Sequence, residues 1–230
     1  LDPSRLLRYK VLRGLGRLVA DKDVRVDRDA ILAQMHRNLI EHVQALACWA
    51  PLDRHAATRE HLSGQILLGL LEDKIRQSLE RAFRLLHIAY RGEDIRGAYL
   101  ALRSSDRLAR SNAMEFLDAL TSDARGVTAH ERRELLKLVI DDLPAEQKVE
   151  RASPHVPDAP ADHEAALLLL LRDHDASVAA LATYYALDLG LSRVVDEAAI
   201  LEQDRPSLQE LTSEALRAAA EGRGGRDVEP

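Results

Sequence analysis

The chain has 230 residues and a formal net charge of −6, and 46% of it is hydrophobic but only 3% is aromatic. Leu and Ala carry most of the apolar content and favour helices, whereas strands favour aromatic and β-branched residues, so the composition argues against a large β-sheet. The single cysteine, Cys48, excludes an intramolecular disulfide framework, and the longest purely apolar run, residues 165–171, is far shorter than the roughly 20 residues of a membrane span.

Apolar residues at helical spacing, together with capping residues and breakers, predict the helices of the first half of the chain. The first helix covers residues 5–19, and the second begins at Asp27 and runs to about Trp49, where Pro51 ends it. The apolar period then continues over residues 56–90, and this length predicts a break near Gly64 or a kink near Gly69.

Shorter helices are predicted in the second half. After Gly92, helices cover residues 93–103 and 106–120, and a capping box formed by Thr128 and Glu131 starts a helix that runs to residue 143. Three further helices are expected, at residues 162–172, 175–189 and 207–220.

Prolines and charge suggest the domain organisation. Residues 144–162 hold four of the eight prolines, which predicts a linker or loop. It separates a helical repeat region at 1–143 from acidic helices at 163–220, which are expected to form a further repeat or a cap. Residues 221–230 are predicted to be disordered. Residues 1–140 carry 24 Lys+Arg and 19 Asp+Glu, whereas residues 141–230 carry 8 and 19. We therefore expect the N-terminal side to face something anionic.

Three segments share one template, in which a capping residue is followed by an aliphatic or small residue at +3, a basic or small residue at +4, and apolar residues at +7 and +11. The capping residues are Ser4, Asp106 and Asp175. A capped helix with small inner residues suits the second helix of an antiparallel pair that buries its faces by stacking on its neighbours. The expected fold is all-α, a HEAT-like α-solenoid, with an irregular helical bundle as the alternative.

Particular strings carry a family resemblance. Residues 7–15 (LRYKVLRGL), 78–90 (SLERAFRLLHIAY) and 94–120 resemble a soluble region of bacterial membrane proteins that look like ATP/ADP-translocase or major-facilitator transporters with cytosolic HEAT-like repeats. The resemblance covers about residues 2–143. It implies a fold and a location at the cytosolic face of the inner membrane, and it brings no catalytic residues. Because the chain begins with Leu1 rather than Met, we expect it to be a piece of a larger protein of this kind.

Two basic stripes are candidate contacts for an anionic membrane surface, which attracts each such residue by about 1 kcal/mol. The first stripe contains Lys10, Arg13 and Arg17, and the second contains Lys74, Arg81 and Arg84. The alternative is a pair of solvated helix faces. Net acidity and the scarcity of aromatic residues argue against nucleic acid as the partner.

The titratable residues form no constellation that predicts catalysis, a cofactor or a metal site. The best metal candidate is His163 beside Asp173, His174 and Asp175, but Asp175 is already explained as a helix cap. Tyr99, Tyr184 and Tyr185 are candidate groove contacts, with core packing as the alternative.

The sequence therefore predicts a non-catalytic interaction or regulatory module, the cytosolic part of a larger transporter-like membrane protein. Its expected partner is another protein or the membrane portion of the same protein, and no cofactor or small-molecule substrate is expected. One alternative is a free-standing cytoplasmic protein-binding scaffold. The other is a repeat-built lyase-type enzyme, which needs a pocket where ionisable residues converge.

Overall fold

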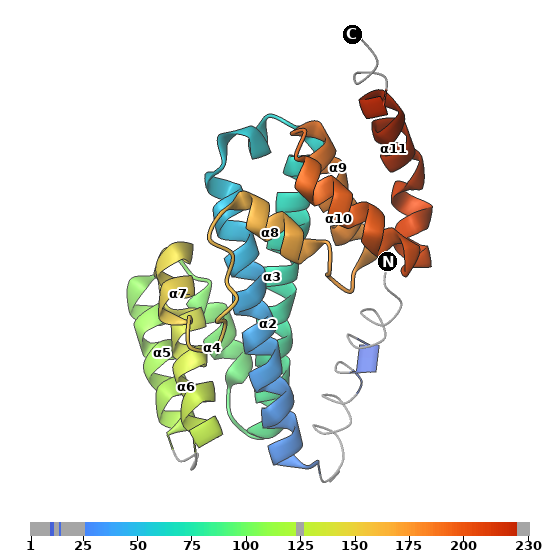
Figure 1. Ribbon diagram of the computed structural model, residues 1–230. Coiled ribbons are helices and arrows are strands. Elements are labelled where there is room, and N and C mark those ends of the chain that lie inside the picture. The colour runs from blue at the N-terminus through green and yellow to red at the C-terminus, as the bar shows by residue number, and fades with distance from the viewer. Residues whose placement is uncertain (1–9, 12–13, 15–25, 123–126, 225–230) are drawn as a thin grey trace. The chain divides into compact units, whose positions relative to one another are not determined.

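The computed structural model describes residues 10, 11, 14, 26–122 and 127–224, and these residues form helices joined by turns and loops (Figure 1). The predicted all-α class is confirmed for this part of the chain. None of the described helices combines the length and the apolar character needed to cross a membrane.

Ten α-helices and one 3₁₀ helix lie within the described residues. They are α2 (Arg28–Arg54), η1 (Ala56–Arg59), α3 (Leu62–Ala89), α4 (Ile95–Leu102), α5 (Arg107–Thr121), α6 (Val127–Ile140), α7 (Ala145–Arg151), α8 (His163–Leu170), α9 (Ala176–Asp188), α10 (Ser192–Gln203) and α11 (Pro206–Gly224).

The contacts within the chain divide it into two compact units. Unit 1 comprises Leu1–Gln44 and Lys74–Pro157, and unit 2 comprises Ala45–Asp73 and Asp158–Pro230. The boundaries fall inside α2 and α3, so each of these helices contributes a part to each unit. One boundary, between residues 157 and 158, falls within the predicted linker at 144–162. The division differs from the prediction in residues 45–73, which group with the C-terminal helices instead of with the rest of residues 1–143.

Aspartate side chains start several helices at the positions that the sequence predicts. Asp27, Asp106, Asp162 and Asp175 each accept a hydrogen bond from a backbone N–H of the first turn that follows. Such caps satisfy donors that the start of a helix leaves unpaired. In the template copies that begin at Asp106 and Asp175, the residues at +7 and +11 are buried, as expected. The copy that begins at Ser4 lies outside the described residues.

Pro51 does not end α2, contrary to the prediction. The helix continues to Arg54, and Ala50 and Leu52 on either side of the proline are buried in unit 2. Proline removes one backbone donor, and burial of its neighbours offsets that loss in the last turn of the helix.

Other boundaries also differ from the prediction. α6 begins at Val127, so Thr128 lies inside the first turn and does not cap it. α7 forms within the predicted linker, directly after Pro144, which occupies the N-cap position with φ −54° and ψ 151°. α10 was not predicted, and α11 continues to Gly224, beyond the predicted start of a disordered tail at residue 221. Residues 225–230 lie outside the described residues.

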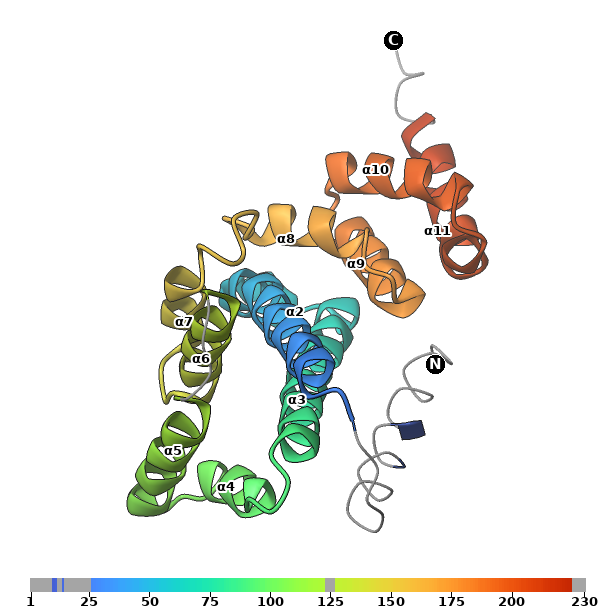
Figure 2. The same cartoon turned by 90° about the horizontal axis from the view of Figure 1, so that it is seen from below.

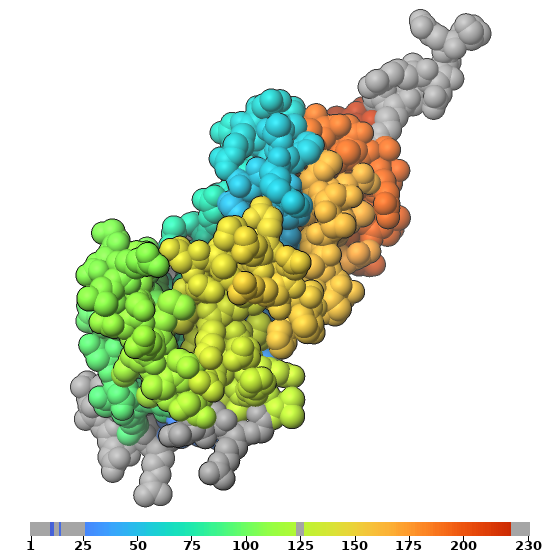
Figure 3. All heavy atoms as spheres, turned by 90° about the vertical axis from the view of Figure 1, so that its left-hand side faces the viewer, coloured from blue at the N-terminus to red at the C-terminus, as the bar shows by residue number. Residues whose placement is uncertain are grey.

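In unit 1, the C-terminal helices pack in chain order, α4 on α5, α5 on α6 and α6 on α7. Figure 2 shows these helices following one another, and their side chains, green to yellow, form much of the face visible in Figure 3. An ion-pair cluster joins α5 to α6, because the carboxylate of Asp118 lies 2.7 Å from Arg133 Nε and 2.9 Å from Lys137 Nζ.

A buried polar contact joins α2 to α3 within unit 1. His42, only 4% exposed, places its Nδ1 atom 3.0 Å from the carbonyl oxygen of Ile75 and 3.0 Å from the hydroxyl of Ser78. The pKa of His42 is lowered to about 4, mainly by burial and to a smaller extent by the nearby charge of Lys148. The hydrogen bond to Ile75 has the opposite effect and raises the pKa. The imidazole is therefore held neutral between the two helices.

In unit 2, α9 packs against α8, α10 and α11 around a Leu- and Ala-rich core. Trp49 is partly buried and packs against this core. Arg205, between α10 and α11, connects this part of unit 2 to the turn after α8. Its guanidinium donates to the carbonyl oxygens of Leu171 and Asp173, each at 2.6 Å. These bonds satisfy carbonyl groups at the C-cap of α8 and in the turn that follows it.

Candidate functional site

The predicted basic stripes are only partly available for an anionic surface. On α3, Arg81 donates to Asn38 and approaches Glu41 at 3.4 Å, and Arg84 pairs with Glu80 at 2.5 Å, one turn away. Lys74 is half-buried and Lys10 is exposed, whereas Arg13 and Arg17 lie outside the described residues. Acidic partners thus offset the charge of the two arginines on α3.

Net charge differs strongly between the two units. Unit 1 carries 24 Lys+Arg and 19 Asp+Glu, a formal charge of +5, whereas unit 2 carries 8 and 19, a formal charge of −11. The acidic side chains of the chain are therefore concentrated in unit 2.

Two arginines, Arg132 and Arg133, line a crevice in unit 1, and Arg28 lies beside its Tyr90. The guanidinium of Arg28 lies 4.3 Å from the ring centroid of Tyr90, and the half-buried Arg132 lines the crevice beside Tyr90. Burial lowers the pKa of Arg132, but Tyr90 and the nearby carboxylate of Asp29 raise it. Arg133, which also lines the crevice, is paired with Asp118. Acidic groups thus accompany the arginines, and the crevice is not a strongly electropositive site.

Unit 2 contains a hydrogen-bonded cluster of histidine, tyrosine and threonine. The hydroxyl of Tyr185 donates to Thr58 Oγ1 at 2.9 Å and lies 3.2 Å from Nδ1 of His55. The tyrosine oxygen is thus within hydrogen-bond distance of both the threonine hydroxyl and the His55 ring. The ring of His55 stacks on that of His163, with the centroids 3.8 Å apart.

Close packing of α3 against η1 and α9 positions this cluster. A Cβ atom at Gly64 would lie 2.4 Å from the carbonyl oxygen of Thr58 and 3.0 Å from Cε2 of Tyr185. Only glycine lets the backbone of α3 approach both groups so closely. Tyr185 is 0% exposed, so its hydroxyl connects α9 to η1 and is closed to solvent.

The electrostatics of the cluster favour neutral side chains. Burial lowers the pKa of His55, and the adjacent His163 lowers it further. The carboxylate of Glu60 has the opposite effect and raises the pKa. Burial raises the pKa of Tyr185, although the hydrogen bond to Thr58 lowers it. Among the described residues, no three His, Cys, Asp or Glu side chains gather as ligands for a metal ion. The cluster thus acts as a neutral connection between helices.

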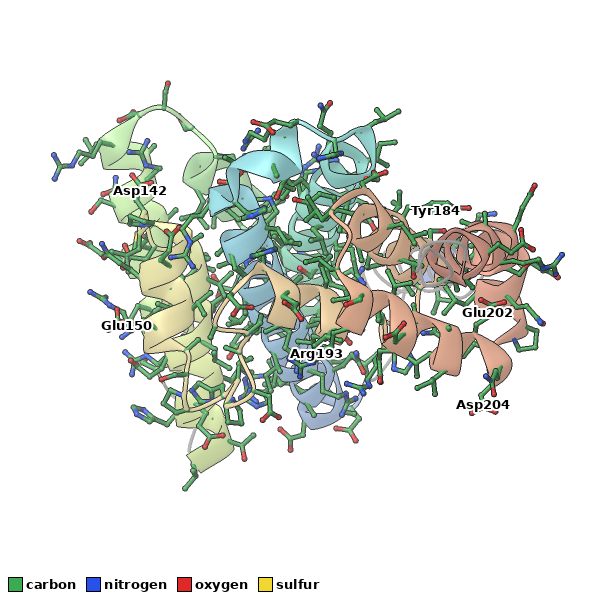
Figure 4. The ribbon with its side chains drawn as sticks, turned by 45° about the horizontal axis from the view of Figure 1, so that its top comes forward. Asp142, Glu150, Tyr184, Arg193, Glu202 and Asp204 are labelled. Carbon is green, nitrogen blue, oxygen red and sulfur yellow. The ribbon has the colours of Figure 1, made fainter. Side chains whose placement is uncertain are left out.

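Unit 2 also exposes apolar side chains on one side. Leu62 and Ile66, one turn apart on α3, are 70% and 48% exposed. On α9, Tyr184, labelled in Figure 4, is 38% exposed, and its hydroxyl donates to the carbonyl oxygen of Leu211 at 2.7 Å. Leu211 on α11 is itself 44% exposed.

A hydrogen bond joins α3 to α9 beside these residues, because the hydroxyl of Ser63 donates to the carboxylate of Asp188. Ser63 lies next to Leu62 on α3, and Asp188 follows Tyr184 by one turn on α9. We call Leu62, Ile66, Tyr184 and Leu211 the apolar face of unit 2.

The structure separates the residues that the sequence placed together. Of the tyrosines predicted as groove contacts, Tyr185 is part of the core and Tyr184 is at the surface. Of the candidate metal ligands, Asp175 caps α9, whereas His163 stacks on His55. Sequence reasoning missed both the cluster and the apolar face. The cluster joins residues more than a hundred positions apart, and no local pattern marks such a contact. The apolar face did have a signal, since residues 66–71 are apolar or glycine at every position.

No family model, no curated protein and no solved structure matches the chain. The resemblance to the repeat region of transporter-like proteins stays a prediction.

Proposed function

We propose that the protein is a helical-repeat interaction module that binds another protein through the apolar face of unit 2. The observation that carries this proposal is the exposure of Leu62 and Ile66 at 70% and 48% on a helix whose other side forms the core. Exposed apolar side chains that cluster on one surface mark binding sites more often than isolated ones do.

The packing of helices in chain order supports the repeat character of the module. In unit 1, α4 to α7 each contact the next helix along the chain, and in unit 2 α8, α9, α10 and α11 do the same. Helical repeats bury their faces by such nearest-neighbour stacking. The HEAT-like arrangement remains part of the proposal, together with a binding rather than a catalytic role.

The transporter-like setting is the second part of the proposal, and it rests on the strings at residues 7–15, 78–90 and 94–120. The reading frame that encodes the chain tests it. A transporter-like protein requires about ten apolar spans of roughly 20 residues each, so a frame without them leaves a free-standing scaffold.

Photo-crosslinking tests the interaction itself. Benzoylphenylalanine is placed singly at Leu62, Leu108 and Ile200 of the full gene product, since all three side chains are exposed. After irradiation in cells, mass spectrometry identifies the crosslinked peptides. We expect one partner protein to be identified reproducibly at Leu62 and not at Leu108 or Ile200, which lie outside the apolar face. The absence of a product at Leu62 contradicts the proposed function.

A further inference from the structure

We propose that the apolar face of unit 2 binds a basic amphipathic helix of a partner protein. This inference rests on the proposed function and adds the chemistry of the partner. It starts from α3, where residues 66–71 are apolar or glycine at every position. A helix that is apolar all round is normally buried on all sides.

Only one side of this segment is covered within unit 2. Leu67, Leu68 and Leu71 belong to the core, whereas Leu62, Ile66 and Gly69 on the other side are exposed. Gly69 has no neighbouring atom within 4 Å of the position that a Cβ would take. A second helix can therefore approach α3 closely at this point.

The exposed residues extend from α3 across α9 to α11. Ser63 is bonded to Asp188, and Tyr184 holds the backbone of α11 through its bond to Leu211. Leu62 and Ile66 lie one turn apart on α3, so both can contact the apolar face of a second helix.

Charge decides between the classes of partner. Exposed carboxylates flank the apolar face, with Glu60 before Leu62 and with Glu210 and Glu214 on either side of Leu211 along α11. Unit 2 as a whole has a formal charge of −11. Such a surface repels anionic lipid and nucleic acid and attracts lysine and arginine. A helix with an apolar stripe and basic flanks fits both features.

A labelled peptide of about 18 residues, with Leu on one helical face and Lys on the other, tests the chemistry by fluorescence anisotropy. The control peptide has the same composition in an order that leaves no apolar face. We expect the full chain to bind the amphipathic peptide about tenfold more tightly than the control.

The site is tested with variants of the full chain. We expect L62S and I66S each to weaken binding of the amphipathic peptide about tenfold, since each removes a large apolar contact. The double variant E210K/E214K should weaken binding and reduce its salt dependence. L108S is the matched control, because Leu108 is 68% exposed and lies in unit 1, and it should leave binding unchanged. The fluorescence of Trp49 verifies that each variant is folded.

Several results overturn the inference. Equal binding of both peptides means attraction by charge alone, and equal effects of L62S and L108S mean that the site lies elsewhere. Binding to phosphatidylglycerol vesicles that depends on Ile66 replaces the protein partner by a membrane. If photo-crosslinking at Leu62 identifies a partner whose crosslinked peptide is not a basic amphipathic helix, the proposed function stands and this inference fails.

Discussion

Protonation of His42 should make the fold weaker in mild acid. The imidazole is buried between α2 and α3 with a pKa lowered to about 4, whereas an unfolded histidine titrates near 6.5. A lowered folded pKa means that the full stability is present above about pH 6.5 and is lost as the pH falls toward 4. The loss attributable to this residue is about 2 kcal/mol between pH 7.5 and pH 5, and it approaches about 3 kcal/mol at pH 4.

Urea unfolding followed by circular dichroism at pH 7.5 and pH 5 measures this loss. We expect H42L to lose about 2 kcal/mol less than the wild type between these pH values, because leucine does not titrate. H87L is the control for loss of a histidine, since His87 is exposed on α3, the helix that His42 contacts, and its loss of stability between these pH values should equal that of the wild type.

The comparison concerns the difference between two pH values, so the cavity or the hydrogen bonds lost in H42L do not affect it. Equal pH dependence of H42L and the wild type contradicts the reasoning. An independent measurement on the wild type is the NMR titration of the His42 ring, whose midpoint is expected well below 6.5. A midpoint near 6.5 contradicts the burial of a neutral imidazole even if the variant does not fold.

Three further substitutions test contacts within the two units. G64A should destabilise unit 2 by about 2 kcal/mol, because its Cβ would meet a backbone oxygen at 2.4 Å. G69A, whose Cβ would lie in open space, should stabilise unit 2 by up to about 1 kcal/mol. Urea unfolding monitored by Trp49 fluorescence compares the two variants, and equal effects refute the close approach at Gly64. Y185F should cost about 1–2 kcal/mol in the same assay, since it removes the bond to Thr58, and a neutral result contradicts the role of the hydroxyl. D118N should lower the free energy of unfolding by less than about 1 kcal/mol at pH 7, because the ion pairs of Asp118 are solvated. The pKa of Asp118 is lowered to about 2, so this contribution is lost as the pH falls from about 4 to 2. A larger cost measured by urea unfolding argues for a buried pair.

Local features of the fold could be predicted from the sequence. Aspartate caps lie within three residues of the donors that they satisfy, so Asp106, Asp162 and Asp175 mark helix starts without any knowledge of the fold. The pairing of Glu80 with Arg84 is likewise visible as a one-turn spacing. The sequence did not indicate that Arg81 meets Glu41, because forty residues separate the two side chains along the chain.

Tertiary packing overrides two local signals. Pro51 is a strong breaker, but the core of unit 2 holds the residues on both sides of it in a helix. Residues 192–203 form α10 although the sequence did not suggest it, and the buried side chains of Val194, Val195 and Ala198 account for its position in unit 2. In both places the partner surfaces come from other helices, which a window along the sequence does not contain.

The charge of the expected partner depends on a long-range contact of this kind. Residues 45–73 and residues 141–157 each carry four acidic and two basic side chains, so assigning the first segment to unit 2 and the second to unit 1 leaves the values of +5 and −11 unchanged. The segment that joins the acidic unit carries Leu62 and Ile66. Counted along the sequence, these two residues fall in the basic part of the chain, where complementarity favours an acidic partner. The bond between Tyr185 and Thr58, across 127 residues, instead places them in the acidic unit, and the expected partner becomes basic.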